Sequence, residues 1–212
     1  MTMALAVEES CSTATRPLSL FAVEPTFTML FCKTELEGAY IIDLEPRVDE
    51  RGFFARTFCE REFAEHALPT HFPQCNLSRN SRRGTLRGMH YEAPPSTESK
   101  LVRCTAGAVF DVIVDLRPSS PTCHRWTSVE LTAVTGRALF VPAGFAHGFL
   151  TLSDDSDVVY HMGDSYRPDA GRGFRWNDEF FSIAWPAAPT SIAKRDAEYP
   201  NFDPTAFQRH EH

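Results

Sequence analysis

The sequence lacks several features that would assign it to a special class of protein. No stretch approaches the 18 or more consecutive apolar residues that a membrane-spanning helix needs. The N-terminus carries Glu8 and Glu9, has only short apolar segments and lacks a basic leading region, which disfavours a secretory signal. Internal repeats and low-complexity linkers are also missing, so we expect a single domain.

Cysteine and positive charge are both too sparse to define a function. The six cysteines form no CxxC motif and no Cys/His pair at zinc spacing. A chain of 212 residues with 42% apolar content can bury a core without disulfides, which favours reduced thiols in a cytosolic protein. A net charge of −7 disfavours a nucleic-acid binder that relies on a broad basic surface, but allows a small anionic ligand in a local basic pocket.

Short segments rich in β-branched and aromatic residues predict an all-β fold. They are bounded by Gly, Pro, Asp or Ser, and their spacing with few helices is typical of a sandwich or barrel. In one of them, alternation places Phe110, Val112 and Val114 on one face and Asp111 on the other. Two segments, 59–67 and 189–199, are expected to be helical. The expected strands are 39–45, 52–58, 100–106, 108–117, 126–134, 137–143 and 157–163.

Eight motifs occur together along the chain. Taken in this order they resemble the dTDP-4-dehydrorhamnose 3,5-epimerase family of nucleotide-sugar enzymes, from about Met29 to Pro200. A single motif would be weak, but eight in register are specific. The motifs are DERGFFARTF (49–58), QCNLS (74–78), LRGMHY (86–91), KLVRC (100–104), FDVIVDLR (110–117), VPAGFAHGF (141–149), the segment from Tyr160 to YRP (160–168), and WNDEFFSIAWP (176–186).

The resemblance implies a cupin-type jelly-roll β-barrel with a few short peripheral helices, a homodimer and a cytoplasmic location. It also implies epimerisation at C3 and C5 of a dTDP-linked 4-keto-6-deoxyhexose, converting dTDP-4-dehydro-6-deoxyglucose to dTDP-4-dehydrorhamnose without a cofactor or metal. No nucleic-acid or membrane partner is expected. Residues 29–212 are expected to form the cupin domain. Residues 1–28 would be a poorly ordered extension outside the resemblance, with Met29 as an alternative start.

The resemblance assigns four residues to the chemistry. His90 is the base that removes a proton next to the C4 ketone, and Asp196 fixes its tautomer and steadies the imidazolium. Tyr160 is the acid on the opposite face of the sugar, because a phenol is protonated at neutral pH. Lys100 stabilises the enolate oxygen. Asp111 is a hypothetical partner that orients Lys100.

Polar side chains that suit a nucleoside diphosphate accompany these four. Arginine forks bind phosphate oxygens in bidentate fashion, and residues two apart on a strand point the same way. Lys100 and Arg103 are three apart, so they should face opposite sides of their strand, with Lys100 inward and Arg103 an ordinary residue. The residues that the resemblance assigns to substrate binding are Arg51, Gln74, Asn76, Arg87, His147 and Tyr166.

Two departures from the family pattern leave the substrate open. Arg56 and Gly171 stand where the family often has glutamates. Both changes leave the proposed chemistry intact, but they put in question the exact nucleotide sugar and whether one carbon or two is epimerised. A histidine such as His90 would be assigned a structural role if it occurred alone. The matching residues Arg87, Lys100 and Asp196 favour a catalytic role instead.

Three other functions compete with the double epimerase. A metal-dependent cupin oxygenase usually needs an HxH pair with a carboxylate and a later His, whereas this strand reads GMHYE. A non-catalytic sugar-binding barrel would need the arginines but not the acid and base. A 3-epimerase, 5-epimerase or ketoisomerase on a related keto sugar would share the chemistry. Solvent deuterium incorporation at C3 and C5 distinguishes these possibilities.

Overall fold

The protein is described by a computed structural model that covers residues 28–204. The extension expected at residues 1–28 therefore lies outside the described residues, apart from Thr28. Among the described helices, none has the length and apolar character needed to cross a membrane. The strands are β1 (Met29–Lys33), β2 (Tyr40–Leu44), β3 (Arg47–Asp49), β4 (Gly52–Phe54), β5 (Gln74–Asn80), β6 (Thr85–Glu92), β7 (Lys100–Ala106), β8 (Ala108–Asp115), β9 (Trp126–Thr132), β10 (Ala138–Val141), β11 (Phe145–Thr151), β12 (Ser156–Met162), β13 (Gly171–Gly173) and β14 (Ser191–Ile192), and the helices are α1 (Glu60–Glu65) and α2 (Lys194–Glu198).

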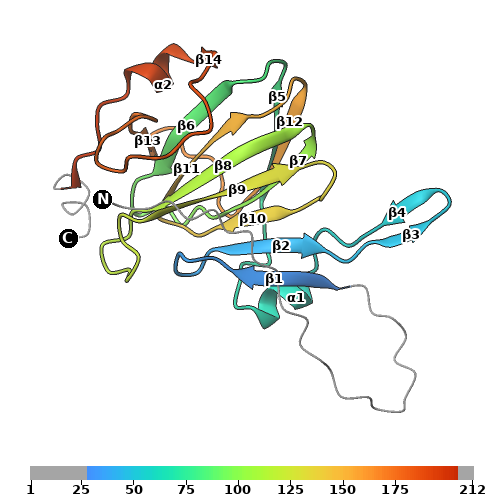
Figure 1. The fold of residues 1–212 in the computed structure, drawn as a ribbon. Coiled ribbons are helices and arrows are strands. Elements are labelled where there is room, and N and C mark those ends of the chain that lie inside the picture. Colours follow the sequence, from blue (N-terminus) through green and yellow to red (C-terminus); the bar gives the residue numbers. More distant parts are fainter. Residues whose placement is uncertain (1–27, 205–212) are drawn as a thin grey trace.

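Two large sheets face each other and form the body of the molecule (Figure 1). One sheet has the order β1-β2-β10-β7-β12-β5, and the other has the order β13-β6-β11-β8-β9, with β14 added alongside β6. Neighbouring strands are antiparallel except in the β14–β6 contact. The residue pattern predicted the all-β character, and the jelly-roll architecture with two short peripheral helices is the one that the family resemblance implied.

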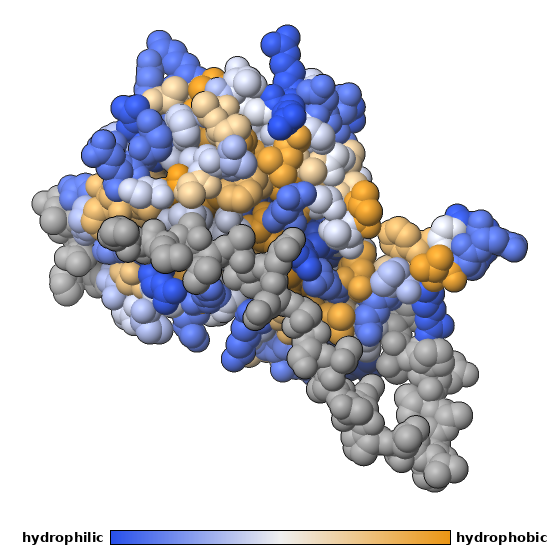
Figure 2. Space-filling model, in the orientation of Figure 1, coloured by the Kyte–Doolittle hydropathy of each residue, from blue (hydrophilic) through white to orange (hydrophobic). Residues whose placement is uncertain are grey.

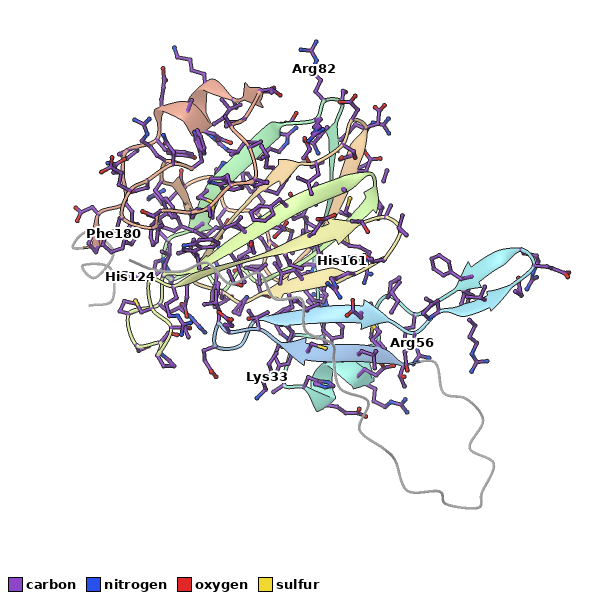
Figure 3. The ribbon with its side chains drawn as sticks, viewed as in Figure 1. Lys33, Arg56, Arg82, His124, His161 and Phe180 are labelled. Carbon is purple, nitrogen blue, oxygen red and sulfur yellow. The ribbon has the colours of Figure 1, made fainter. Side chains whose placement is uncertain are left out.

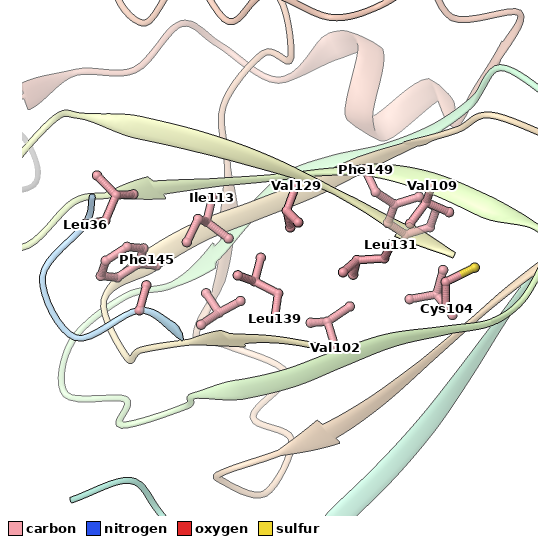
Figure 4. Close-up of a cluster of buried hydrophobic side chains, with 13 residues drawn as sticks. Leu36, Val102, Cys104, Val109, Ile113, Val129, Leu131, Leu139, Phe145 and Phe149 are labelled. Carbon is pink, nitrogen blue, oxygen red and sulfur yellow. The ribbon is translucent and has the colours of Figure 1, made fainter. Parts of the chain in front are cut away.

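Apolar side chains from both sheets fill the space between them (Figure 4). Val102 of β7 and Val158 of β12 meet Ile113 of β8 and Phe149 of β11 in this cluster. Because side chains alternate along a strand, these residues define which face of each strand points into the barrel. Polar residues two or four positions away from them on the same regular strand therefore also point into the barrel.

Strand β8 is buried on both faces. Ile113 belongs to the cluster inside the barrel, whereas Val112 and Val114 pack outside it against Phe174 and Phe181 of the C-terminal segment. The alternation predicted for residues 110–115 is therefore confirmed. A charged group on the inner face, such as Asp111, is fully buried at 0% exposure and must be paired within the protein.

A β-hairpin formed by β3 and β4 projects from the body (Figure 1). The strand predicted over 52–58 is therefore too long, because β4 ends at Phe54 and the chain then turns back toward α1. Apolar side chains lie along the hairpin beside a hydrophilic tip (Figure 2), and Val48, Phe53 and Phe54 are 78%, 57% and 68% exposed. The helix predicted over 189–199 is also shorter, since Ala193 is extended and separates β14 from α2.

Candidate active site

A β-bulge turns Arg87 and His90 of β6 toward the same side. His90 is paired with His147 of β11, and Arg87 is paired with Phe149, so two residues of β6 oppose the single Gly148. Without the bulge, residues three apart would face opposite sides of the strand. Since opposite residues in an antiparallel pair share a face, Arg87 and His90 both join the inward side that Phe149 defines.

Glycine is required at the bulge. Gly88 has a φ of +133°, and a Cβ there would lie 2.6 Å from Gly148 Cα. Gly52 on the hairpin has a similar φ of +127° but has no atom within 4 Å of its Cβ position. A side chain at either glycine would be strained by the positive φ. Only at Gly88 would its Cβ also collide with a neighbouring backbone atom.

We expect Gly88→Ala to lower the melting temperature by roughly 6–12 °C, which corresponds to about 3 kcal/mol in a chain of this size. The backbone collision has no flexible side chain to absorb it. Gly52→Ala is the matched control and is expected to lose only the smaller cost of the positive φ. Thermal unfolding followed by circular dichroism measures both, and equal losses would show that the bulge is not tightly packed.

His90 is held by Asp196 of α2. The His90 Nε2–Asp196 Oδ1 distance is 2.9 Å, and the Gly88 amide donates to the other oxygen of Asp196 at 3.2 Å. Burial alone would raise the pKa of Asp196, but the contacts from His90 and the Gly88 amide lower it overall. An ionised carboxylate can only accept hydrogen bonds, so Nε2 carries the proton and Nδ1 keeps the lone pair that a base needs.

A second histidine–aspartate pair lies deeper in the barrel. His147 Nε2 is 2.9 Å from both oxygens of Asp111, and the two side chains are 6% and 0% exposed. Burial raises the pKa of Asp111, and the charges of His147 and Lys100 oppose that shift. The hydrogen bonds of Asp111 go to His147. Asp111 and Lys100 interact through charge, and the hypothesis that Asp111 orients Lys100 stays a prediction.

Lys100 points into the barrel, as predicted, but its partner was missed. Its Nζ lies 3.1 Å from Glu98 Oε1, with side chains that are 13% and 7% exposed. The sequence does carry a signal for this pair, because residues two apart in an extended chain point the same way.

Arg103 faces the opposite side of β7 from Lys100, as the alternation predicted. Its interpretation as an ordinary residue is wrong. The side chain is buried, its Nη2 donates to the Thr57 carbonyl at 3.1 Å, and burial lowers its pKa to about 10. Arg103 contacts the Thr57 carbonyl, and Arg56 pairs with Glu62 of α1, so neither points into the barrel interior. Figure 3 shows Arg56 near the base of the hairpin.

Tyr160 of β12 lies beside His147. The two rings meet edge to face with centroids 5.9 Å apart, and Tyr160 packs against the cluster between the sheets. Burial and then the charge of Asp111 raise the pKa of the Tyr160 hydroxyl. The hydroxyl therefore keeps its proton at neutral pH and can donate it.

Most of the residues assigned to substrate binding surround this interior. Asn76 of β5 pairs with Tyr160 across the sheet and accepts a hydrogen bond from Gln74 Nε2 at 3.1 Å. Tyr166 reaches this group only through its backbone: its amide donates to Gln74 Oε1 at 3.3 Å, and its side chain is exposed. Arg87 Nε donates to Asn80 Oδ1 at 2.8 Å, and Asn80 is a buried anchor that sequence reasoning missed.

Arg51 is the exception among the binding residues. It lies at the turn of the projecting hairpin, its side chain is 84% exposed, and its Nη2 is 2.6 Å from Asp49 Oδ2. Within one chain it does not join the inward-facing group, because the hairpin extends away from the body (Figure 1). Two positions depart from the family pattern, Arg56 and Gly171. Arg56 pairs with Glu62 at 2.5 Å, and Gly171 lies on β13 opposite Glu92.

Two surface cavities lie apart from this group. One of about 420 Å³ is lined by residues including Trp176 and Trp185, and one of about 250 Å³ by residues including Tyr91, Arg172 and Phe202. None of the assigned residues lines either cavity. Within residues 28–204, no group of three or more His, Cys, Asp and Glu side chains is arranged to hold a metal ion.

Comparison with known proteins identifies the family. The family model described as dTDP-4-dehydrorhamnose 3,5-epimerase matches residues 33–204. The chain belongs to this family. A member from Escherichia coli K12 is 47% identical over 158 residues, which are 73% of this chain and 83% of that protein.

Solved structures of similar proteins share the fold. The Bacillus anthracis dTDP-4-dehydrorhamnose 3,5-epimerase, solved with TDP and PPi bound, is 34% identical, with a TM-score of 0.80 over 82% of this chain and 100% of that one. A 3'-monoepimerase from Streptomyces bikiniensis, solved with dTDP-quinovose, is 33% identical, with a TM-score of 0.74 over 83% of this chain and 88% of that one. The resemblance drawn from the eight motifs is therefore confirmed.

Proposed function

We propose that the chain is an isomerase that epimerises C3 and C5 of a dTDP-4-keto-6-deoxyhexose, giving dTDP-4-dehydrorhamnose from dTDP-4-dehydro-6-deoxyglucose. The observation that carries the proposal is the grouping of the His90–Asp196 pair, Lys100 and Tyr160 around one barrel interior in a member of this family. Relatives solved with dTDP or a dTDP-sugar support the choice of substrate.

The proposed reaction begins with proton removal beside the C4 ketone. His90 takes the proton through Nδ1, and the electron pair of the broken C–H bond moves into an enolate with its charge on the C4 oxygen. Asp196 accepts the hydrogen bond from Nε2 and stabilises the imidazolium. The Lys100 ammonium stabilises the enolate oxygen, where a fixed charge is worth more than in water.

Inversion requires a proton from the other face. Tyr160 donates its hydroxyl proton to the same carbon, the enolate collapses to the ketone, and the carbon has changed configuration. Exchange with water then removes the proton from His90 and restores the one on Tyr160. The same cycle at the second carbon completes the double epimerisation.

The diphosphate and nucleotide require positive charge and polar contacts at the edge of the barrel. We assign Arg87 to a phosphate oxygen, and Gln74 and Asn76 to polar atoms of the nucleotide. His147 and Tyr166 line the site. Arg51 lies apart from the others in one chain, so its assignment depends on a second protomer.

A homodimer is part of the proposal. The hairpin exposes Phe53 and Phe54 on a projecting arm, and exposed apolar surface of this kind marks an interaction site. A second copy that received the arm would cover these rings and bring Arg51 to a neighbouring site. Sedimentation equilibrium tests this directly, since a mass equal to one chain would refute it. The cytoplasmic location stays a prediction.

The experiment that tests the function is solvent exchange. The 4-keto nucleotide sugar is incubated with the protein in D2O and followed by NMR. We expect deuterium at both C3 and C5, with formation of the rhamno product. Label at one carbon would indicate a monoepimerase such as the Streptomyces relative. Exchange no faster than in a protein-free sample would refute the proposal for this substrate.

A further inference from the structure

Glu98 controls a group that the reaction needs. It lies in the connection between β6 and β7, two residues before Lys100, and its carboxylate is 3.1 Å from the Lys100 ammonium. Both side chains are largely removed from water. A buried ammonium needs a fixed counter-charge, so the carboxylate that pairs with Lys100 also decides where its Nζ lies.

A second carboxyl group lies near this pair. Glu92, at the end of β6, accepts a hydrogen bond from the Ser96 hydroxyl and raises the pKa of Glu98. The Glu98 amide donates to that hydroxyl at 3.2 Å, which ties the two glutamates to one turn of the connection. Burial is the main cause that raises the pKa of Glu98, and the nearby Glu92 carboxylate adds to that rise.

Lys100 has a competing carboxylate inside the barrel. Asp111 is fully buried and shares its oxygens with His147, and the charge of Lys100 lowers the Asp111 pKa against the effect of burial. If Lys100 moved onto Asp111, it would disturb the His147–Asp111 pair and leave the position assigned to the enolate oxygen. The ion pair with Glu98 opposes such a movement, because it attracts the ammonium to a carboxylate outside the His147–Asp111 pair.

We propose that Glu98 is a positioning residue that holds the Lys100 ammonium off Asp111 and over the reacting sugar. This inference rests on the proposed function for its kinetic consequence. Its structural consequence, the position of Nζ, is independent of any activity.

The structural test is a pair of crystal structures. In Glu98→Gln, we expect Nζ of Lys100 to move to within hydrogen-bond distance of Asp111, about 3 Å. In the unchanged protein it should remain on Glu98. If Nζ keeps its place in Glu98→Gln, the positioning role is refuted, whether or not the protein is an epimerase.

The kinetic test uses the exchange assay. Glu98→Gln should lower kcat about tenfold with a change in KM of less than about twofold, since the displaced charge matters in the transition state. Glu130→Gln, an exposed glutamate on β9, is the matched control and should change neither constant. The proposal would be overturned if kcat per folded active site were unchanged in Glu98→Gln. This holds even if the substitution lowers the amount of folded protein. Absence of exchange in the unchanged protein would instead refute the proposed function.

Glu92→Gln supplies a pH readout. The charged groups that act on Glu98 are Lys100 from β7 and Glu92 from β6. Burial raises the pKa of Glu98, and Glu92 adds to that rise while Lys100 opposes it. Removing the Glu92 carboxylate makes Glu98 ionise more readily, so its pair with Lys100 persists to lower pH. The pKa of Glu98, followed by carbon NMR, should fall by about half a pH unit or more in Glu92→Gln, and an unmoved pKa would contradict the influence of Glu92.

Discussion

Replacing His90 with alanine is expected to abolish deuterium incorporation at both C3 and C5, with a loss on the order of 10³-fold, within the range that a general base supplies. The reason is that both carbons flank the same ketone and use the same base. Asp196 already occupies Nε2, so Nδ1 of this one ring is the atom available to take either proton. The measurement is the NMR exchange assay under single-turnover conditions.

The control for His90→Ala is His71→Ala, because His71 is an exposed histidine outside the barrel. It should retain full exchange. Thermal unfolding of both variants separates lost chemistry from lost structure, since His90 also anchors Asp196. Full turnover by a folded His90→Ala protein would overturn the assignment of the base. Loss at one carbon only would mean that a second base, for which His147 is the nearest histidine, acts at the other.

Replacing Tyr160 with phenylalanine is expected to separate exchange from inversion. His90 can still form the enolate and return a deuteron to the face from which it took the proton, so label should appear at a rate within about tenfold of the unchanged protein. Inversion needs the hydroxyl on the opposite face and should fall about 10²–10³-fold. The phenylalanine ring keeps the packing against His147. NMR reads both quantities, because label and configuration are resolved at each carbon.

Tyr40→Phe is the matched control for the hydroxyl. Tyr40 is a half-buried tyrosine on β2 whose ring packs against His66, outside the candidate site. It should preserve both exchange and inversion. If Tyr160→Phe inverts both carbons at the normal rate, the proton on the second face comes from another donor. If it stops exchange as well as inversion, Tyr160 is needed to form the enolate.

The sequence predicted the fold well where the pattern is local. The alternation in residues 110–115 gave both faces of β8, and the spacing of Lys100 and Arg103 gave their opposite directions. Alternation failed at β6, because an extra residue in the strand turns Arg87 and His90 the same way. Period-two reasoning alone would have separated them. Only the family resemblance brought the two side chains together.

Other features depend on contacts between distant segments and could not be predicted from local pattern. The sequence predicts an ordinary role for Arg103, because nothing in KLVRC shows that the side chain is buried against the carbonyl of Thr57. The partner of His147 was missed because Asp111 lies on another strand and was assigned to Lys100. Arg51 was grouped with the site because a motif records spacing along the chain and does not show that a hairpin projects from the body.

The proposed reaction requires a base, an acid and a cation that all contact one sugar ring. A crystal structure with a dTDP-6-deoxyhexose that has a hydroxyl at C4, and therefore cannot enolise, tests this most directly. We expect His90 Nδ1 on one face of the ring near C3 and C5, the Tyr160 hydroxyl on the other face, and Lys100 Nζ within hydrogen-bond distance of the C4 oxygen. A sugar bound with His90 and Tyr160 on the same face, or outside the barrel, would contradict the account.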